Sequence, residues 1–305
     1  MKALTHTNSD NIKYAVAAIL FTVLALSLGD AFIKQISTDF TLWQIFIFRS
    51  LIAIPMLILV SKNRGITSFK PHQLFWTASR SLMLTFMWVA YYMALPRIDL
   101  SIAAAAYYTL PIFITLFAAL FIGDKIGGRG WTVVFLGFAG VILILKPQAA
   151  QFNAYALLPI LSAVLYALAM ILTRTKCRDE NPLLLSLALN ISFIAVGILA
   201  TLFIKLGQPL LVAAANDSFL LGQGTVMGLS EWAVMGLLAM MTLIGSIGAA
   251  YAYQAAPSAI VATFDFAYVA FATVWGLLFF GEVPDLITMI GMGFIVGSGL
   301  IAVRQ

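Results

Sequence analysis

Long uninterrupted runs of apolar residues, each about 20 residues in length, dominate this chain, and that length matches a helix that crosses a bilayer. The runs do not alternate between apolar and polar residues, so helices are favoured over the strands of a membrane β-barrel. A chain that is 62% hydrophobic and 10% charged cannot bury this much apolar surface as a soluble domain. We therefore predict an all-α polytopic membrane protein. Breaks at glycine, proline and charged residues delimit ten transmembrane helices, at residues 12–34, 42–61, 74–95, 101–122, 128–145, 154–173, 183–205, 230–254, 258–280 and 285–303.

Two parts of the chain resemble each other. Residues 92–96 (Tyr-Met-Ala-Leu-Pro) and the later pair Gly123-Asp124 correspond to residues 253–257 (Tyr-Gln-Ala-Ala-Pro) and the pair Gly281-Glu282. Five predicted helices separate the copies, and an odd number of crossings inverts the second copy in the membrane. We therefore predict two inverted five-helix repeats, residues 1–150 and 151–305. Inverted repeats build the two halves of many secondary transporters, with the solute site between them.

Basic residues are distributed unevenly among the loops. With a cytoplasmic N-terminus, the inner segments carry eleven of them and the outer segments only four, so the positive-inside rule places both termini in the cytoplasm, and we expect the inner membrane of a bacterial-type cell. The inner residues are Lys2, Lys13, Lys62, Arg64, Lys70, Lys125, Arg129, Arg174, Lys176, Arg178 and Arg304, and the outer ones are Lys34, Arg97, Lys146 and Lys205. No basic stripe alternates with aromatic residues, so a nucleic-acid partner is not expected.

A family resemblance rests on the ten predicted helices and the five-plus-five repeat, together with Phe48-Arg49-Ser50 in helix two and an apolar run that ends Phe121-Ile122-Gly123-Asp124. With the second copy's Phe280-Gly281-Glu282, the pattern resembles the drug/metabolite transporter superfamily, and within it the EamA family. The resemblance implies a transport role and a cavity lined by helices three and nine. It also implies solutes such as amino-acid-like metabolites, S-adenosylmethionine-like or riboflavin-like cofactors, or amphipathic toxic compounds, and it favours export over import.

Four ionisable residues lie well inside the predicted spans: Asp30, Arg49, Arg80 and Asp265. A charge at this depth costs about 2.5 to 3.5 kcal/mol on insertion scales, so such residues are usually paired or functional. Helix direction places Asp30 and Arg49 in the outer half and Arg80 and Asp265 in the inner half. One hypothesis is a charged cluster toward each gate, with Asp265 or Asp30 as a proton site. The alternative is two static salt bridges that fix helix packing. Lys34 is a second possible partner for Asp30, one helical turn away.

Aromatic residues suggest the chemistry of the cavity. Walls of tyrosine and tryptophan with few polar groups suit an organic solute with a flat or amphipathic body, including a cation held over ring faces. The alternative is an aromatic belt at the membrane interface, which is as good an explanation for Tyr91 and Tyr92. The candidates for the cavity wall are Trp88 on helix three, which faces Tyr107 and Tyr108, and the more deeply placed Tyr107, Tyr166 and Tyr268.

Proline and glycine positions predict local geometry. Pro111 is expected to kink helix four near mid-membrane, which would free carbonyl groups for the solute. Small residues at 101–106 and 245–250 and the glycines of helix ten, Gly291, Gly293, Gly297 and Gly299, predict close approach between helices.

Enzymatic functions are disfavoured by the residues. His6 and His72 both lie outside the spans, and neither a Gly-x-Ser-x-Gly nor a P-loop sequence occurs, so no cofactor or metal is expected and energy must come from a gradient. We predict a secondary-active transporter that moves a small organic metabolite by alternating access, with protons as the candidate coupling ion. The alternative is a channel or facilitator for a small solute.

Overall fold

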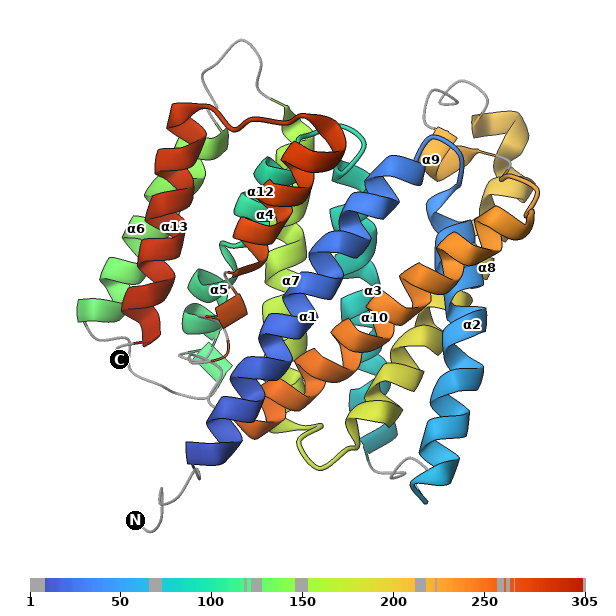
Figure 1. Cartoon of the computed structure of the whole chain (residues 1–305), viewed down its shortest axis with the longest axis horizontal. Coiled ribbons are helices and arrows are strands. Elements are labelled where there is room, and N and C mark those ends of the chain that lie inside the picture. The colour runs from blue at the N-terminus through green and yellow to red at the C-terminus, as the bar shows by residue number, and fades with distance from the viewer. Residues whose placement is uncertain are drawn as a thin grey trace.

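Long α-helices that run up and down through the molecule make up most of the computed structural model (Figure 1). The structure describes residues 9–65, 73–117, 120–121, 128–145, 153–211, 218–222, 224–256, 261, 264–265 and 267–303. Of the residues used in the predictions, Lys2, His6, Lys70, His72, 122–125, Lys146, Pro257 and Arg304 lie outside this part of the chain. The helices are α1 Ser9–Ile36, α2 Leu42–Asn63, α3 Leu74–Ala94, α4 Leu100–Tyr107, α5 Leu110–Phe117, α6 Gly128–Leu145, α7 Leu157–Thr175, α8 Pro182–Leu211, α9 Ser218–Leu221, α10 Leu229–Ala255, α12 Ala267–Phe280 and α13 Leu286–Val303.

The prediction of an all-α polytopic membrane protein is confirmed. Within the described residues, five segments are each long and apolar enough to cross a membrane in one piece, and shorter apolar helices accompany them. The long spans are Ile12–Ile36, Leu42–Asn63, Ala154–Thr175, Pro182–Leu206 and Leu229–Ala255, and the shorter ones are Leu100–Ile114, Phe135–Ile144, Ala267–Phe280 and Leu286–Ser298.

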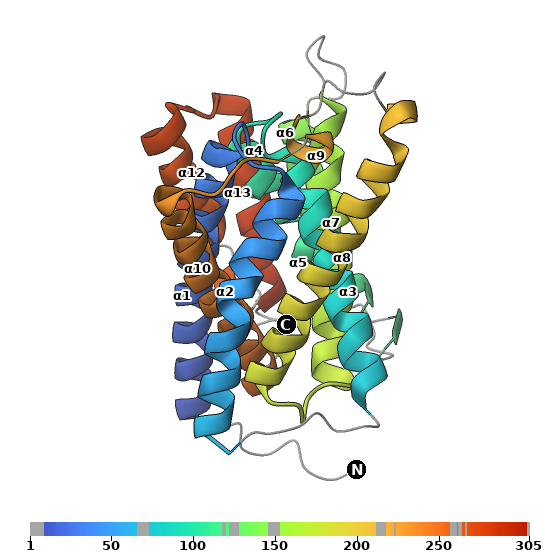
Figure 2. The ribbon, with the colours of Figure 1, turned by 90° about the vertical axis from the view of Figure 1, so that its right-hand side faces the viewer.

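The helix bundle has an upper and a lower face. We call the face at which α1 ends and α2 begins the upper face, and the face at which α2 ends and α8 begins the lower face; these are the top and bottom of Figure 1. Seen from the side, the helices stand close together and extend from one face to the other (Figure 2). Helices α1, α3, α4, α7, α10 and α12 pack on one another in the middle of the molecule, and their facing residues form the largest buried cluster.

The helix predicted at residues 101–122 is broken into two. Helix α4 ends at Tyr107 and α5 begins at Leu110, so Pro111 is the second residue of a new helix and not the kink of a continuous one. Proline is well tolerated there because the first turn of a helix has no intrahelical partner for its N–H groups. Hydrogen bonds continue across the break, since the Thr109 carbonyl accepts from the backbone N–H of Ile112 at 3.0 Å.

The helix predicted at 183–205 extends to Leu211 as α8, and the connection that follows it contacts the start of α2. Helix α2 begins with a capping box between Thr41 and Gln44. The Gln44 side chain also donates to the Thr225 carbonyl at 2.8 Å and accepts from its N–H at 3.0 Å, and the Trp43 indole donates to the Leu220 carbonyl at 2.8 Å. The described part of this connection is therefore tied to the upper face.

Helices α6 and α13 form a closely packed pair at one edge of the bundle (Figure 1). A Cβ atom at Gly140 would lie 2.7 Å from the Gly291 carbonyl oxygen, and one at Gly291 would lie 2.7 Å from a side-chain carbon of Ile144. The predicted close approach at Gly291 is thus confirmed. At Gly293 it was wrong, because a Cβ there would meet nothing within 4 Å.

Substituting Gly291 with alanine is therefore expected to destabilise the protein by about 1 to 3 kcal/mol, since the new methyl group overlaps the backbone and side chains of α6. Thermal unfolding of the detergent-solubilised variant measures the effect. Gly293→Ala, two residues further along the same helix, is the matched control and should leave the melting temperature within error. Equal melting temperatures for the two variants would contradict the packing described here.

Candidate functional site

Seven tyrosines from five helices and the α4–α5 break gather in the middle of the bundle. Tyr107 lies at the centre, with its ring centroid 5.4 Å from that of Tyr91, 5.8 Å from Tyr166 and 6.3 Å from Tyr268. We call the whole group the tyrosine cluster: Tyr91, Tyr92, Tyr107, Tyr108, Tyr166, Tyr253 and Tyr268. Tyrosine suits this depth because its ring is apolar and its hydroxyl can both donate and accept a hydrogen bond.

Asp265 is one of two carboxyl groups enclosed by the tyrosine cluster. Its side chain is 4% exposed and accepts hydrogen bonds from the hydroxyls of Tyr108 at 3.3 Å and Tyr253 at 3.1 Å. The hydroxyl of Tyr166 in turn interacts with Tyr253. No basic side chain in the described part of the chain forms an ion pair with Asp265.

Asp30 is the second enclosed carboxyl group, and it is 1% exposed. It accepts a short hydrogen bond from the hydroxyl of Tyr268, whose oxygen lies 2.8 Å from that of Tyr91. Because the Tyr268 proton is directed at Asp30, Tyr91 is the donor in the second bond. The rings of Tyr108 and Tyr268 lie 5.4 Å apart and 32° from parallel, so the surroundings of the two carboxyl groups join through this ring pair.

Two buried arginines lie at opposite ends of the cluster. Arg49 donates to the Tyr92 hydroxyl at 3.5 Å, and Tyr92 also interacts with Asp30. Arg80 donates through Nε to the Thr173 hydroxyl at 2.6 Å and interacts electrostatically with Tyr166. Each arginine is 1% exposed. The polar groups therefore follow an order from Arg49 through Asp30 and Asp265 to Arg80, with tyrosine hydroxyls between the charges.

A small cavity opens between the tyrosine rings and Asp265. Its volume is about 20 Å³, which is room for about one water molecule, whereas pockets that bind organic ligands measure about 300 to 1,000 Å³. The centre of the bundle is therefore closed around its polar groups, and an organic solute requires the helices to separate. The lining residues are Val23, Leu26, Met87, Trp88, Tyr91, Tyr107, Tyr108, Tyr166, Asp265 and Tyr268.

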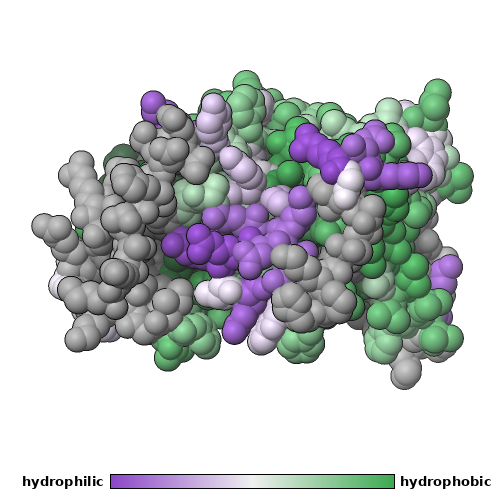
Figure 3. Space-filling model, turned by 90° about the horizontal axis from the view of Figure 1, so that it is seen from below, coloured by the Kyte–Doolittle hydropathy of each residue, from purple (hydrophilic) through white to green (hydrophobic). Residues whose placement is uncertain are grey.

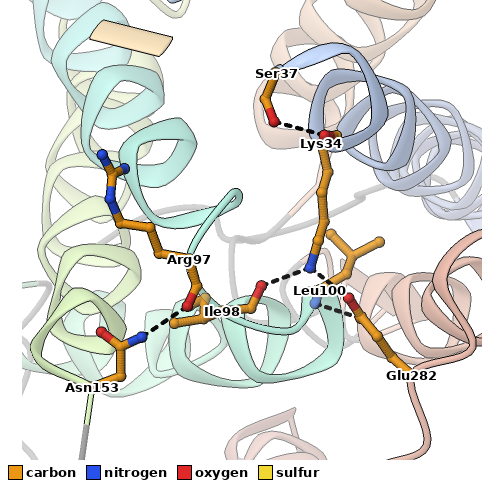
Figure 4. A network of polar contacts seen from close by, with 7 residues as sticks. All are labelled: Lys34, Ser37, Arg97, Ile98, Leu100, Asn153 and Glu282. Carbon is orange, nitrogen blue, oxygen red and sulfur yellow. Dashed lines mark hydrogen bonds and ion pairs between the residues drawn. The ribbon is translucent and has the colours of Figure 1, made fainter. Parts of the chain in front are cut away.

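Above Asp30, a polar network closes the upper face (Figure 4). Lys34 forms an ion pair with Glu282 and donates to the Ile98 carbonyl at 2.7 Å, while the other Glu282 oxygen accepts from the Leu100 N–H at 2.7 Å. The network ties the end of α1 and the start of α4 to the segment between α12 and α13. Asn153 extends it by donating to the Arg97 carbonyl at 2.8 Å.

The lower face carries most of the described exposed basic residues. Hydrophilic residues gather on it, surrounded by hydrophobic flanks (Figure 3). Its exposed basic residues are Lys13, Lys62, Arg64, Lys176 and Arg178. The loop between α7 and α8 is held by Gln254, whose amide donates to the carbonyls of Cys177 at 3.1 Å and Glu180 at 2.9 Å.

The structure brings together most of the residues singled out by the sequence, although with different partners. Asp265, Trp88, Tyr107, Tyr166 and Tyr268 line one cavity. The expected ion pair of Arg80 with Asp265 is absent, since Arg80 binds Thr173 and Asp265 binds two tyrosines. Asp30 and Arg49 lie on either side of Tyr92 and form no direct ion pair. Lys34 pairs with Glu282 and not with Asp30.

The structure also places Tyr91, Tyr92 and Glu282, and it describes the backbone of Pro111. Tyr91 and Tyr92 are each 2% exposed and belong to the tyrosine cluster, so the explanation of an interfacial aromatic belt was wrong for them. Glu282 was not proposed as a functional residue. Its position at the end of the duplicated pair Gly281-Glu282 is the signal that could have found it. Pro111 is described only through its backbone, within the first turn of α5.

The structure is that of an all-α polytopic membrane protein with an enclosed polar centre. Residues 13–146 match the model of the EamA-like transporter family. The chain is therefore similar to a family of transporters over this part of its length, and this match and the names of its relatives indicate a transporter and not an enzyme.

Several curated proteins are similar along most of their length. The pseudopaline exporter CntI of Pseudomonas aeruginosa strain PAO1 is 25% identical over 94% of this chain and 95% of its own. The riboflavin transporter of Rhizobium johnstonii is 27% identical over 88% and 82%, and the S-adenosylmethionine uptake transporter of Rickettsia bellii is 22% identical over 92% and 90%. A crystal structure shares the fold with a TM-score of 0.63 at 17% identity, over 97% of this chain and 99% of that one.

Breaking the ion pair between Lys34 and Glu282 is expected to loosen the upper face. Lys34→Ala should lower the free energy of unfolding by about 2 to 3 kcal/mol, because it leaves a largely buried carboxylate without its partner. Thermal unfolding and labelling of a cysteine placed at Trp88, in a Cys177→Ser background, measure stability and access from the upper face. Lys205→Ala, an exposed lysine on the same face, is the control. Unchanged labelling and stability in Lys34→Ala would show that this network does not hold the upper face closed.

Proposed function

We propose that the protein is a secondary-active transporter that carries a small organic solute through the tyrosine cluster by alternating access, with protons as the coupling ion. The observation that carries the proposal is the pair of buried carboxyl groups, Asp30 and Asp265, neither of which has an ion pair among the described residues. Asp265 lines the closed cavity, and Asp30 is hydrogen-bonded to Tyr268, which also lines it.

Charge is the first reason. A carboxylate at membrane depth is costly, and unpaired ones in such positions usually exchange protons or bind a cationic ligand. Among the described residues, the polar groups that face Asp265 are hydroxyls: those of Tyr108 beside α4, Tyr253 on α10 and Tyr166 on α7. Asp30 faces Tyr268 on α12, Tyr91 and Tyr92 on α3, and the more distant Arg49 on α2. Each carboxyl group is thus placed to hold a proton in one state and to release it, or exchange it for a cationic solute, in another.

The closed cavity is the second reason. It is about 20 Å³ in volume, far too small for an organic solute, and the Lys34–Glu282 network lies between it and the upper face. A solute can occupy such a site only after helices move apart on one side. This supports a carrier that opens its two sides in turn. The alternative is a channel, which the flux measurements below would distinguish from a carrier.

The third reason concerns the solute. The relatives are named for the export of pseudopaline or the transport of riboflavin or S-adenosylmethionine. Rings of Trp88, Tyr107 and Tyr268 line the cavity, and they suit a flat or amphipathic body or a cation held over a ring face. We therefore infer an organic metabolite comparable to the solutes for which the relatives are named. The gradients of the solute and of the coupling ion set the direction of its movement.

Orientation follows from the distribution of charge. The exposed basic residues of the lower face support a cytoplasmic location for that face and for both termini, in an inner membrane. The Lys34–Glu282 network would then close the protein toward the outside, and the described state would be one that is shut on its outer side.

Asp265→Asn should abolish coupled transport and leave a folded protein, because an amide can accept from one tyrosine hydroxyl and donate to the other but cannot take up and release a proton. A stabilisation screen of the purified protein with amino acids, nucleosides, flavins, S-adenosyl compounds and lipophilic cations first identifies a solute. Its uptake into proteoliposomes is then measured. Asp99→Asn, an exposed carboxyl group on the upper face, is the matched control. Normal uptake by Asp265→Asn would remove this residue from the mechanism.

Proton movement gives an independent test. In proteoliposomes loaded with a pH-sensitive dye, adding the solute should change the internal pH at a rate that follows solute flux. An imposed pH gradient should drive accumulation of the solute above its external concentration. Flux that equilibrates the solute and ignores the pH gradient would identify a channel or facilitator instead.

A further inference from the structure

Arg49 is a buried cation with unused hydrogen-bond donors. Its side chain is 1% exposed, and its Nε and Nη2 atoms have no hydrogen-bond partner. Among the described residues its hydrogen bond, from Nη1 to the Tyr92 hydroxyl, is 3.5 Å long. Buried polar groups in proteins are nearly always satisfied, so donors left open at this depth require an explanation.

Aromatic rings hold the guanidinium group without satisfying its N–H groups. Its central carbon lies 4.6 Å from the ring centroid of Phe193, 5.0 Å from Phe46 and 5.7 Å from Tyr92. Ring faces stabilise the positive charge, whereas the N–H groups point outward along the edges of the guanidinium plane. Those edges match the two oxygens of a carboxylate or a similar oxyanion, which arginine binds in a bidentate manner.

Within the part of the chain that the structure describes, no such oxyanion contacts Arg49. Asp30 is separated from Arg49 by the Tyr92 hydroxyl, and within the described residues Arg49 takes part in no ion pair. The opposite end of the cluster differs. Arg80 uses its Nε for a 2.6 Å hydrogen bond to Thr173, only its Nη1 is without a partner, and it has no ring face among the described cation–π contacts.

Arg49 is also connected to the transport site. Tyr92 lies between Arg49 and Asp30, and its ring stacks on that of Trp88, which lines the cavity, with centroids 4.9 Å apart. A rotation of Tyr92 and Trp88 would therefore expose the guanidinium edge to a solute in the cavity. Asp30 would remain about one hydroxyl group away from it, within reach of a cationic or hydrogen-bond-donating part of the same molecule.

We propose that Arg49 is an anion subsite of the transport site, where it binds a carboxylate or comparable oxyanion group carried by the solute. This inference rests on the proposed function and narrows it to solutes that bear an acidic group. The bound acid supplies the acceptors that the Nε and Nη2 donors lack, and it neutralises a charge that otherwise meets aromatic rings and one long hydrogen bond to Tyr92 among the described residues.

The test uses four probes that share one ring system: tryptophan, tryptophanamide, tryptamine and indole-3-propionate. Binding to the full-length protein in detergent is measured by thermal stabilisation and by calorimetry, neither of which has to rely on tryptophan fluorescence. Chloride is tested alone in a separate experiment. Wild type is expected to bind the two carboxylate probes at least about tenfold more tightly than the amide and the amine. Stabilisation by chloride alone would show a site for free inorganic anions and would overturn the assignment to the solute.

Variants of Arg49 distinguish a role in binding the carboxylate probes from a role in stabilising the fold. Arg49→Gln should lose the preference for carboxylate probes, and Arg49→Lys should keep only part of it, because lysine retains the charge but not the planar fork. Arg64→Gln, an exposed arginine at the end of α2, is the control and should keep the full preference. The melting temperature of unliganded Arg49→Gln should be equal to or above that of wild type, since an unsatisfied buried charge is removed.

The outcomes also separate this inference from the proposed function. Equal binding of acid, amide and amine probes would overturn the anion subsite and leave the cavity as the solute site. Failure of every probe to bind would overturn the subsite, and the broader solute screen and the proton measurements would then decide on transport. A large fall in melting temperature for Arg49→Gln, with an unchanged preference among the probes, would make Arg49 a packing residue.

Discussion

The cost of placing charge inside a membrane governs the centre of this protein. Two carboxyl groups and two guanidinium groups lie almost completely buried, and none of the four pairs directly with another. Tyrosine hydroxyls lie between them and supply hydrogen bonds that water would otherwise give. Because these hydroxyls come from α3, α7, α10, α12 and the α4–α5 break, the helices that surround the cavity are held by the same polar contacts that a solute would have to rearrange under the proposed function.

The membrane-spanning helices could be predicted from the sequence because their signal is strong and local. Apolar runs of the right length, ended by glycine, proline or charge, reproduce the helix limits to within a few residues at most ends. The two clear differences have local causes. Pro111 fits the first turn of a new helix better than the interior of a long one, so helix four is broken before it. Helix α8 continues six residues beyond the predicted end at Lys205, along a stretch where composition gives no decisive stop.

The site was harder to predict than the fold because it depends on which way each residue points around its helix. Depth estimates brought Asp30 and Arg49 to one level and Arg80 and Asp265 to another, and opposite charges at one level suggested ion pairs. The pairs are replaced by tyrosine contacts, since Tyr92 lies between Asp30 and Arg49, and Tyr253 and Tyr166 lie between Asp265 and Arg80. Contacts of this kind between distant helices leave no pattern along the chain. The same holds for the pairing of Lys34 with Glu282, which are 248 positions apart.

The predicted duplication relates contacts at the upper face of the protein to contacts at its lower face. In the sequence comparison Tyr92 corresponds to Tyr253, and in the structure each of these tyrosines lies beside one buried carboxyl group, Asp30 or Asp265. Lys34, at the upper end of α1, donates to the Ile98 carbonyl after α3, and Arg174, at the lower end of α7, donates to the Ala256 carbonyl after α10. An inverted repeat would produce this exchange of ends, although the division at residue 150 stays a prediction. Contacts of one kind at both faces, formed by helices that the predicted repeat makes equivalent, would give the proposed alternating access a simple basis. A solute that weakened one set would leave the other in place, so the two sides would not have to open together.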